Sequence, residues 1–311
     1  ASAPGMRTRL WPEHGYAALR SGDPADYWKG DGFSVFLTYD HDGIHAHRDK
    51  LSLMLYGRGR HLAVDPEALA SEQHAFSSRV QAELNRSTLC HNTVMLDGLD
   101  HSGVPERLEL LDFVDNSGVR LATLADRRGI VYPGAALMRT VAVTEHFVLD
   151  LFQVACTRER EIAYLFHSAA DSGTLEASAP AAAFDLPAEG AWRWLRDGRR
   201  CVEDGAWSVQ AVQDGVRLRL TAAPEPGTEV ILCRFPARDD FGGTSWPMLI
   251  ARRRAAYTVF AILLQAEKTD LPNAHIEVSA GRHGTLKARV TLDGLPRPFD
   301  FSVRRLTPPA G

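Results

Sequence analysis

The sequence lacks the features that mark several large classes of protein. Its 35 basic residues do not exceed its 39 acidic ones, and the net charge is −4. This balance gives no electrostatic basis for binding nucleic acid or an anionic membrane. No apolar run approaches the roughly 20 residues that a membrane-spanning helix needs. We therefore expect no nucleic-acid partner and no membrane partner.

Cysteine is scarce, and its spacing excludes one kind of metal site. Cys90, Cys156, Cys201 and Cys233 lie far apart, with no CxxC pair among them. A zinc site made of cysteines is therefore not expected. Two disulfides would be possible in an exported protein, but free cysteine is one of the most buried residue types, which favours four buried free thiols.

Helical periodicity is also scarce, whereas short β-rich runs are frequent. Residues 71–84 are the best helical candidate, and their apolar spacing is loose. The β-rich runs are separated by Gly, Pro, Asn and Asp; they are 33–39, 50–56, 60–65, 93–96, 118–125, 139–155, 161–167, 207–212, 216–222, 229–234, 257–265, 274–279 and 286–292. This pattern predicts an all-β protein, a large antiparallel β-sandwich with few short helices, and disfavours βαβ units.

The chain of 311 residues is long enough for one large β domain or for two domains. A weak boundary near Pro236 to Asp240 predicts a sandwich over residues 1–235. Residues 236–311 then continue this sandwich or form a small C-terminal β-sheet subdomain. Because the chain starts at Ala1 and has no secretory apolar segment, we expect an excised or processed piece of a longer protein.

A histidine-rich segment near the N-terminus raises the question of a metal or proton-transfer site. Side chains alternate faces in an extended chain, so His45 and His47 point the same way. A glycine-bearing turn at Gly57–Gly59 predicts a hairpin that returns Asp65 close to His47. A third imidazole, His91, lies where another strand begins. Two histidines, one aspartate and a water would form a four-coordinate zinc site; the alternative is that these histidines are hydrogen-bonded residues at strand ends.

Two longer motifs resemble a known family. The first is H-A-H-R-D-K-L-S-L at residues 45–53 with the hairpin that follows it, and the second is R-S-T-L-C-H-N-T-V-M-L-D-G at 86–98. Together they resemble the C-terminal β domain of heparinase II/III-like polysaccharide lyases, a group that includes oligoalginate lyases. Looser similarity extends over roughly residues 15–264. The resemblance implies a β-supersandwich.

The resemblance also implies roles for individual residues. It implies structural zinc bound by His47, Asp65 and His91, and a catalytic His45 that reaches the substrate cleft. The sequence departs from the family pattern in two places. Ala46 replaces the usual glycine, and Pro66-Glu67-Ala68 stands where a glycine-rich segment is common.

Three further residues are candidates for substrate binding. Arg86 and Asn92 flank His91 and can contact an anionic sugar; a strand-end ion pair or a turn cap is the alternative for both. His167 ends a predicted strand and can line the cleft, although a hydrogen-bonded core histidine is the alternative. The resemblance implies an acidic polysaccharide or oligosaccharide as substrate and β-elimination next to a uronate carboxylate as the reaction.

The family carries its tyrosine and its main catalytic histidine on an N-terminal α/α toroid, and this chain has no such helical block. We therefore expect it to be the β-domain portion of a polysaccharide lyase that works with an α/α toroid domain of the same protein. A periplasmic or secreted location is expected, with the signal peptide outside this chain.

Two other functions stay open at this stage. One is a non-catalytic β-sandwich that binds an acidic glycan. The other is a zinc hydrolase, because His45-x-His47-x-Asp49 resembles the start of the H-x-H-x-D-H signature of metallo-β-lactamase-like enzymes. Lys50 stands where that signature has its last histidine, and the βα alternation of that fold is not predicted.

Overall fold

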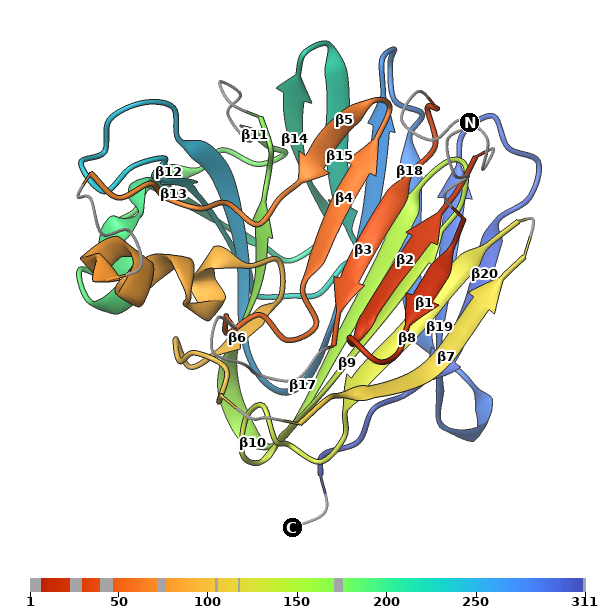
Figure 1. Cartoon of the computed structure of the whole chain (residues 1–311). Coiled ribbons are helices and arrows are strands. Elements are labelled where there is room, and N and C mark those ends of the chain that lie inside the picture. The colour runs from red at the N-terminus through yellow and green to blue at the C-terminus, as the bar shows by residue number, and fades with distance from the viewer. Residues whose placement is uncertain are drawn as a thin grey trace, which may run out of the picture.

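The computed structural model describes residues 7–22, 30–39, 47–71, 77–103, 106–116, 118–170 and 176–309. Antiparallel strands dominate it, which confirms the all-β, sandwich-like class (Figure 1). The strands are β1 (Arg9–Trp11), β2 (Tyr16–Arg20), β3 (Ser34–Thr38), β4 (Leu53–Gly57), β5 (Arg60–Ala63), β6 (Val94–Leu96), β7 (Glu109–Asp115), β8 (Arg120–Asp126), β9 (Ala135–Val143), β10 (Val148–His167), β11 (Glu176–Ala177), β12 (Ala182–Ala183), β13 (Arg196–Glu203), β14 (Trp207–Gln213), β15 (Val216–Ala222), β16 (Thr228–Phe235), β17 (Trp246–Glu267), β18 (Ala274–Ala280), β19 (Thr285–Leu292) and β20 (Phe299–Arg304).

The strands form three layers. A five-stranded sheet has the order β1-β2-β3-β4-β5, a 12-stranded sheet contains β6 to β17, and β18-β19-β20 form a third sheet. The main core lies between the first two sheets, where Leu37 and Leu55 pack with Phe152 and Phe260. A second apolar cluster, which includes Leu149 and residues of β18 to β20, covers the other face of the large sheet. The large sheet is therefore buried on both sides.

Two long strands shape the large sheet. β10 and β17 pair along almost their whole length, with a register shift between Ala155 and Arg160, and both curve strongly (Figure 1). β17 pairs with β16 in its first part and with β15 in its last part. The curved sheet thus has two arms, one carrying β13 and β16 and the other β14 and β15, and both arms contribute to the same core.

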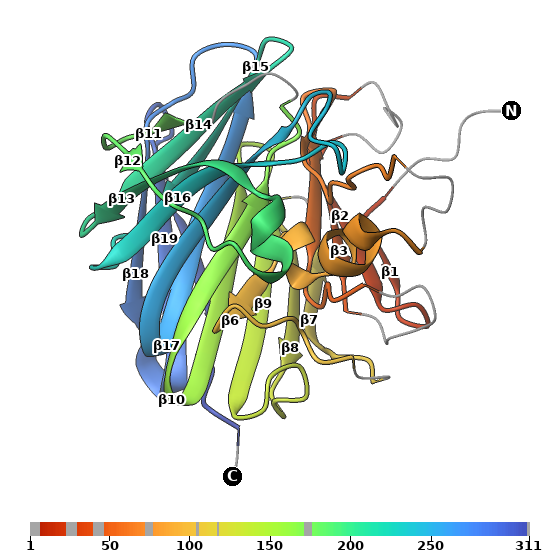
Figure 2. The same cartoon turned by 90° about the vertical axis from the view of Figure 1, so that its left-hand side faces the viewer.

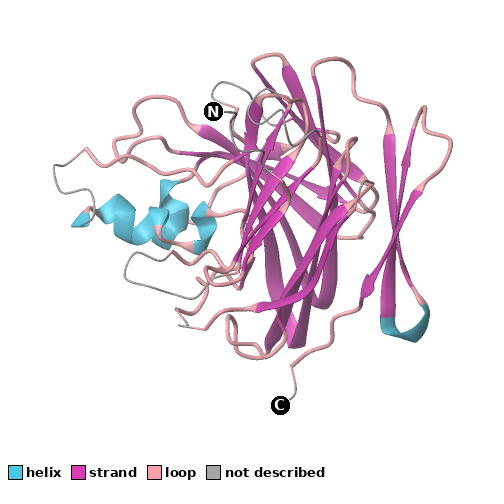
Figure 3. Cartoon of the chain, turned by 45° about the vertical axis from the view of Figure 1, so that its right-hand side comes forward, coloured by secondary structure: helices cyan, strands magenta, loops and turns pink. Residues whose placement is uncertain are grey.

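The helical segments are short. They are η2 (Gln81–Asn85), η3 (Thr88–Cys90), η4 (Gly190–Trp194) and η5 (Arg282–Gly284). η2 and η4 lie side by side (Figure 2), and Trp194 Nε1 donates a hydrogen bond to Glu83 Oε2 at 3.2 Å. This helical group and the three-stranded sheet lie on opposite sides of the domain (Figure 3). Among the described residues, no helix has the length and apolar character needed to cross a membrane.

Local predictions met mixed outcomes. The turn at Arg58 and Gly59 is confirmed: both residues have positive φ, and Gly57 pairs with Arg60. The helix predicted over 71–84 is seen only from about residue 79 to Asn85, with residues 72–76 outside the described part of the chain. The single strand predicted over 139–155 is wrong, because β9 ends at Val143. There, Thr144 Oγ1 accepts hydrogen bonds from the backbone of residues 146 and 147 and closes a turn.

The four cysteines are free and buried, as expected for this residue type.

Beyond residue 235, β17 belongs to the large sheet, whereas residues 274–304 form the separate three-stranded sheet. The domain boundary at residue 235 stays a prediction.

Candidate metal centre

Asp49, Asp65 and His91 come together at one edge of the five-stranded sheet. Their potential ligand atoms all lie within 4.8 Å of one another. The β4–β5 hairpin returns Asp65 as the sequence predicted, and Ser52 Oγ donates a hydrogen bond to Asp65 Oδ1 at 3.3 Å. His91 follows directly after η3. Three segments far apart in sequence therefore place two carboxylates and an imidazole around one point.

His91 has the environment expected of a metal ligand. Its side chain is only 2% exposed, and its Nδ1 lies 3.2 Å from Asp65 Oδ2. Both of its ring nitrogens are buried without a well-directed hydrogen bond in the described part of the chain. Buried ring nitrogens without such a partner are costly, so the imidazole of His91 is well placed to bind a cation beside the two carboxylates.

His47 lies beside the same cluster. Its ring centroid is 5.2 Å from that of His91, with the two planes tilted by 45°. Burial lowers the pKa of His47, and the nearby charge of His91 lowers it further. A neutral imidazole is the form that binds a metal ion.

The charges within the cluster depend on one another. Burial acts to lower the pKa of His91, but the charge and hydrogen bond of Asp65, together with Asp49, raise it above its usual value. Burial has the opposite effect on a carboxyl group, and it raises the pKa of Asp49. For Asp65, burial acts to raise the pKa, and His91 outweighs it and lowers the pKa. A positive charge between two acids packed this closely stabilises their charged forms, whether it comes from an imidazolium or from a metal ion.

Asn92 is the cross-link that holds these segments together. Its Nδ2 donates to the backbone oxygens of Leu53 at 2.9 Å and Val64 at 2.7 Å. Its Oδ1 accepts from the backbone N–H of His167 at 2.6 Å. One buried amide thus joins β4, the segment that leads to Asp65, and the end of β10.

A buried ion pair between β9 and β10 also supports the segments that carry Asp49 and His91. Arg139 and Asp150 are both fully buried; Arg139 Nε and Nη2 donate to the two carboxylate oxygens of Asp150 at 2.9 and 2.6 Å. Tyr164 donates to Asp150 Oδ2 at 2.9 Å. Arg139 Nη1 donates to the backbone oxygens of Leu51 and Asn92, at 2.5 Å each. Leu51 has a φ of +59°, a strained conformation for a branched side chain, and Arg139 helps to hold it.

The structure places the predicted site residues as follows. His47, Asp65 and His91 are brought together, whereas His45 lies outside the described residues. Arg86 is exposed, and its charge acts on His47. Asn92 is fully buried, where it bonds to backbone. His167 is buried as well, its pKa is lowered to about 3 by burial, and its ring packs edge-on against Phe235 at 5.5 Å. These positions suit Arg86 for contact with a ligand and suit Asn92 and His167 for support; the substrate-binding roles of all three stay predictions.

Asp49 is the residue that sequence reasoning did not select. It lies two residues after His47, between the bend at Arg48 and the turn at Lys50 and Leu51 that precede β4. With it the cluster offers one imidazole and two carboxylates within 4.8 Å of one another, and His47, whose ring lies beside that of His91, would be the fourth donor of a tetrahedral zinc site. The buried imidazole of His91 and the adjacent carboxylates fit such an ion.

Comparison with known protein families gives a match over most of the chain. The family model described as "Heparinase II/III-like, C-terminal" matches residues 3–232. The chain belongs to this family. The resemblance seen in the two sequence motifs is therefore confirmed. No curated protein sequence matches the chain.

Solved heparinase structures share the fold. A mutant of the heparan sulfate lyase HepC from Pedobacter heparinus superposes with a TM-score of 0.71 at 15% identity, covering 97% of this chain and 43% of that chain. A heparinase III gene product with methylated lysines gives 0.71 at 12% identity, covering 97% and 42%. HepC itself gives 0.68 at 14% identity, covering 96% and 43%. This heparinase-family chain thus spans less than half the length of the structures it matches.

Proposed function

We propose that this chain is the β-domain portion of a polysaccharide lyase that cleaves a uronate-containing polysaccharide, alginate or heparin-like, by β-elimination. A structural zinc ion beside the cleft, an α/α toroid domain in the same protein and a periplasmic or secreted location belong to this proposal. The observation that carries it is the cluster of Asp49, Asp65 and His91 with His47 beside it, in a chain of the heparinase II/III-like family.

The number of donors supports a structural role for the metal. Structural zinc sites have four protein ligands, whereas catalytic sites keep one position open for water or substrate. His47, Asp49, Asp65 and His91 would fill all four positions. Zinc bound there would supply positive charge to the two carboxylates and fix the segment around His47 against the rest of the sheet.

The reaction sets clear requirements for the protein. A base removes the proton from C5 of the uronate, a double bond forms between C4 and C5, the C4–O bond breaks, and an acid protonates the leaving oxygen. The uronate carboxylate gains negative charge as the proton leaves, so a cation beside it lowers the barrier. We assign His45 to this neutralisation or to proton transfer, because it lies two residues before His47 and shares its face in an extended chain. We also assign Arg86, whose charge acts on His47, to the attraction of the anionic sugar.

The test is an assay of the complete gene product on a panel of uronate polysaccharides. The expected products are unsaturated uronates, which absorb in the ultraviolet. His45→Ala should remove most of this activity. His61→Ala, which changes an exposed histidine on β5, is the matched control and should leave the activity unchanged. Normal turnover by His45→Ala would show that His45 does not have the assigned role.

A non-catalytic module that binds acidic glycans is the second candidate. The observation that favours it is a pocket whose lining includes Arg199 on β13 and Arg234 on β16, because such a pocket is suited to binding an acidic group. If the complete gene product binds a uronate polysaccharide and releases no unsaturated product from any member of the panel, this alternative replaces the lyase.

A further inference from the structure

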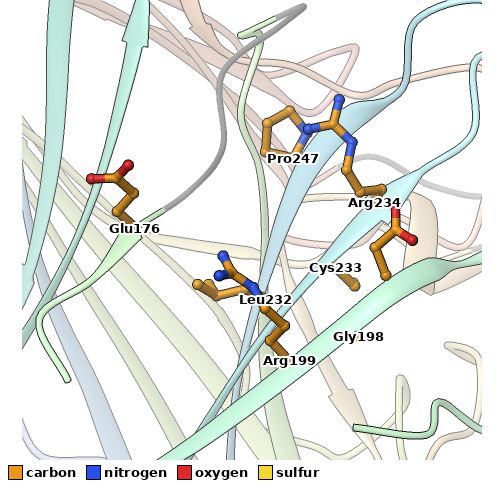
Figure 4. A pocket seen from close by; sticks show the side chains of 8 residues that line it. Glu176, Gly198, Arg199, Leu232, Cys233, Arg234 and Pro247 are labelled. Carbon is orange, nitrogen blue, oxygen red and sulfur yellow. The ribbon is translucent and has the colours of Figure 1, made fainter. Parts of the chain in front are cut away.

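A pocket of about 360 Å³ lies away from the metal cluster, at the open end between the two arms of the curved sheet. Figure 4 shows Arg199 extending toward the side of the pocket on which Glu176 lies, with Arg234 and Pro247 next to each other on another side. Leu232 contributes apolar surface. The volume lies in the range of small-molecule sites, about 300–1,000 Å³.

The backbone beside this pocket is irregular in a way that aims side chains into it. β13 has a register shift between Arg196 and Arg199, and Asp197 has a φ of +57°. Gly198 allows the neighbouring segment to approach closely, because a Cβ on it would lie 2.4 Å from the backbone oxygen of Phe184. A β-bulge redirects the side chains that follow it, and strained backbone is concentrated at functional sites. Here the bulge places Asp197 and Arg199 in the lining.

The second arginine is held in a fixed position. Arg234 Nε donates to Ser245 Oγ at 2.6 Å, and its Nη2 donates to the backbone oxygen of Ser245. This anchoring fixes the plane of the guanidinium at the pocket wall. A fixed guanidinium keeps its positive charge at one place on the wall, where it can attract a carboxylate.

The mixture of charges selects the class of ligand. Two arginines attract an anion, whereas Glu176 and Asp197 repel one that carries several charges and accept hydrogen bonds from hydroxyls. A sugar with one carboxylate satisfies both pairs, and its apolar ring face fits against Leu232. We propose that this pocket is a binding subsite for an acidic sugar residue of a glycan chain. The choice of a uronate as the sugar rests on the proposed function.

The pocket is separate from the metal cluster. Its lining comes from β11, β13, β16 and β17 and includes none of the cluster residues. The two sites share only the framework of the sheet, in which Cys233 pairs with Met248 and Met248 pairs with His167. Binding here would therefore hold a glycan chain away from the position where we expect cleavage.

The test is calorimetric titration of the full chain with a trimannuronate, a heparan-derived tetrasaccharide and the neutral cellotetraose. At least one of the acidic probes should bind, and the neutral one should not. Arg199→Gln and Arg234→Gln should each weaken binding of the acidic probe by about tenfold or more, the usual effect of losing a hydrogen bond from a charged group. Arg217→Gln, which changes an exposed arginine on β15, is the matched control and should bind like the unchanged chain.

The outcomes separate this inference from the proposed function. Absence of acidic-sugar binding, equal binding of cellotetraose, or an unchanged affinity in Arg199→Gln would overturn the subsite. Arg199 is exposed, so this variant remains a fair test even if Arg234→Gln fails to fold. Lyase activity of the complete gene product without binding at the pocket would refute the subsite alone. Binding that depends on Arg199, in a complete gene product with no lyase activity, would refute the lyase alone.

Discussion

Arg139 offers the sharpest test of how the candidate metal centre is supported. Replacement of Arg139 by Met puts a long apolar side chain in its place. The carboxylate of Asp150 then stays fully buried without its guanidinium partner. The backbone oxygens of Leu51 and Asn92 lose the same donor. Tyr164 keeps its bond to Asp150 but cannot neutralise the charge.

The expected cost follows from this geometry. Breaking a buried ion pair by removing one partner costs about 3–5 kcal/mol. Because two further hydrogen bonds from a charged group are lost, we expect the upper end of that range. Such a loss is a large share of the usual stability of about 5–15 kcal/mol. The double variant Arg139→Met with Asp150→Leu removes the buried charge, so it should recover at least about 2 kcal/mol relative to the sum of the single effects.

Urea unfolding of the single and double variants measures these free energies. Zinc titration of the folded proteins measures whether the loss of Arg139 also weakens zinc binding. Leu51 lies two residues from Asp49, and Asn92 follows His91, so the double variant should bind zinc roughly 10–100-fold more weakly even though it is folded. An Arg139→Met variant that loses less than about 1 kcal/mol, or a double variant with unchanged zinc affinity, would refute this account of Arg139.

Three more predictions concern the cluster and a nearby histidine. Elemental analysis should find about one zinc per chain, lost in His91→Ala, and a metal-free chain of unchanged stability would contradict the site. Asp49→Asn should weaken zinc binding in a direct titration, whereas equal affinity would remove Asp49 from the ligand set. Burial lowers the pKa of His101 from 6.5 to about 3, so below pH 6.5 the unfolded chain binds the additional proton. The stability that His101 contributes is complete above pH 6.5 and is lost as the pH falls toward 3. Urea unfolding of His101→Gln should therefore show a free energy of unfolding that falls less steeply with decreasing pH. An equally steep fall in this variant would show that His101 is not a source of the acid sensitivity.

Strands with regular alternation and well-defined turns were predictable from the sequence. The glycine turn at residues 57–59 fixes the β4–β5 register closely enough to return Asp65 to the cluster. β7 was not predicted, because the register shift between Leu110 and Asp112 breaks its period of two. β2 was not predicted either, since its central residues are buried on both faces and do not alternate.

The candidate site was predictable only in part, because its assembly depends on long-range contacts. His47, Asp65 and His91 carry a residue-type signal that sequence reasoning can find. The support that Arg139 gives to Leu51 and Asn92 joins positions 88 and 47 residues apart, and local periodicity holds no information about such pairs. Asp49 was not selected, and strand alternation could not have placed it, because the chain bends at Arg48 and turns at Lys50 and Leu51.

The curvature of β10 and β17 has a consequence for how the arginine-lined pocket receives a ligand. Both walls of the pocket belong to arms joined by these two strands, and β10 is hydrogen-bonded on both edges along most of its length. Movement of the arms relative to each other would therefore bend β17 and strain that ladder. A pocket built this way is already formed before any sugar arrives, so little of the binding energy is spent on reorganising the protein.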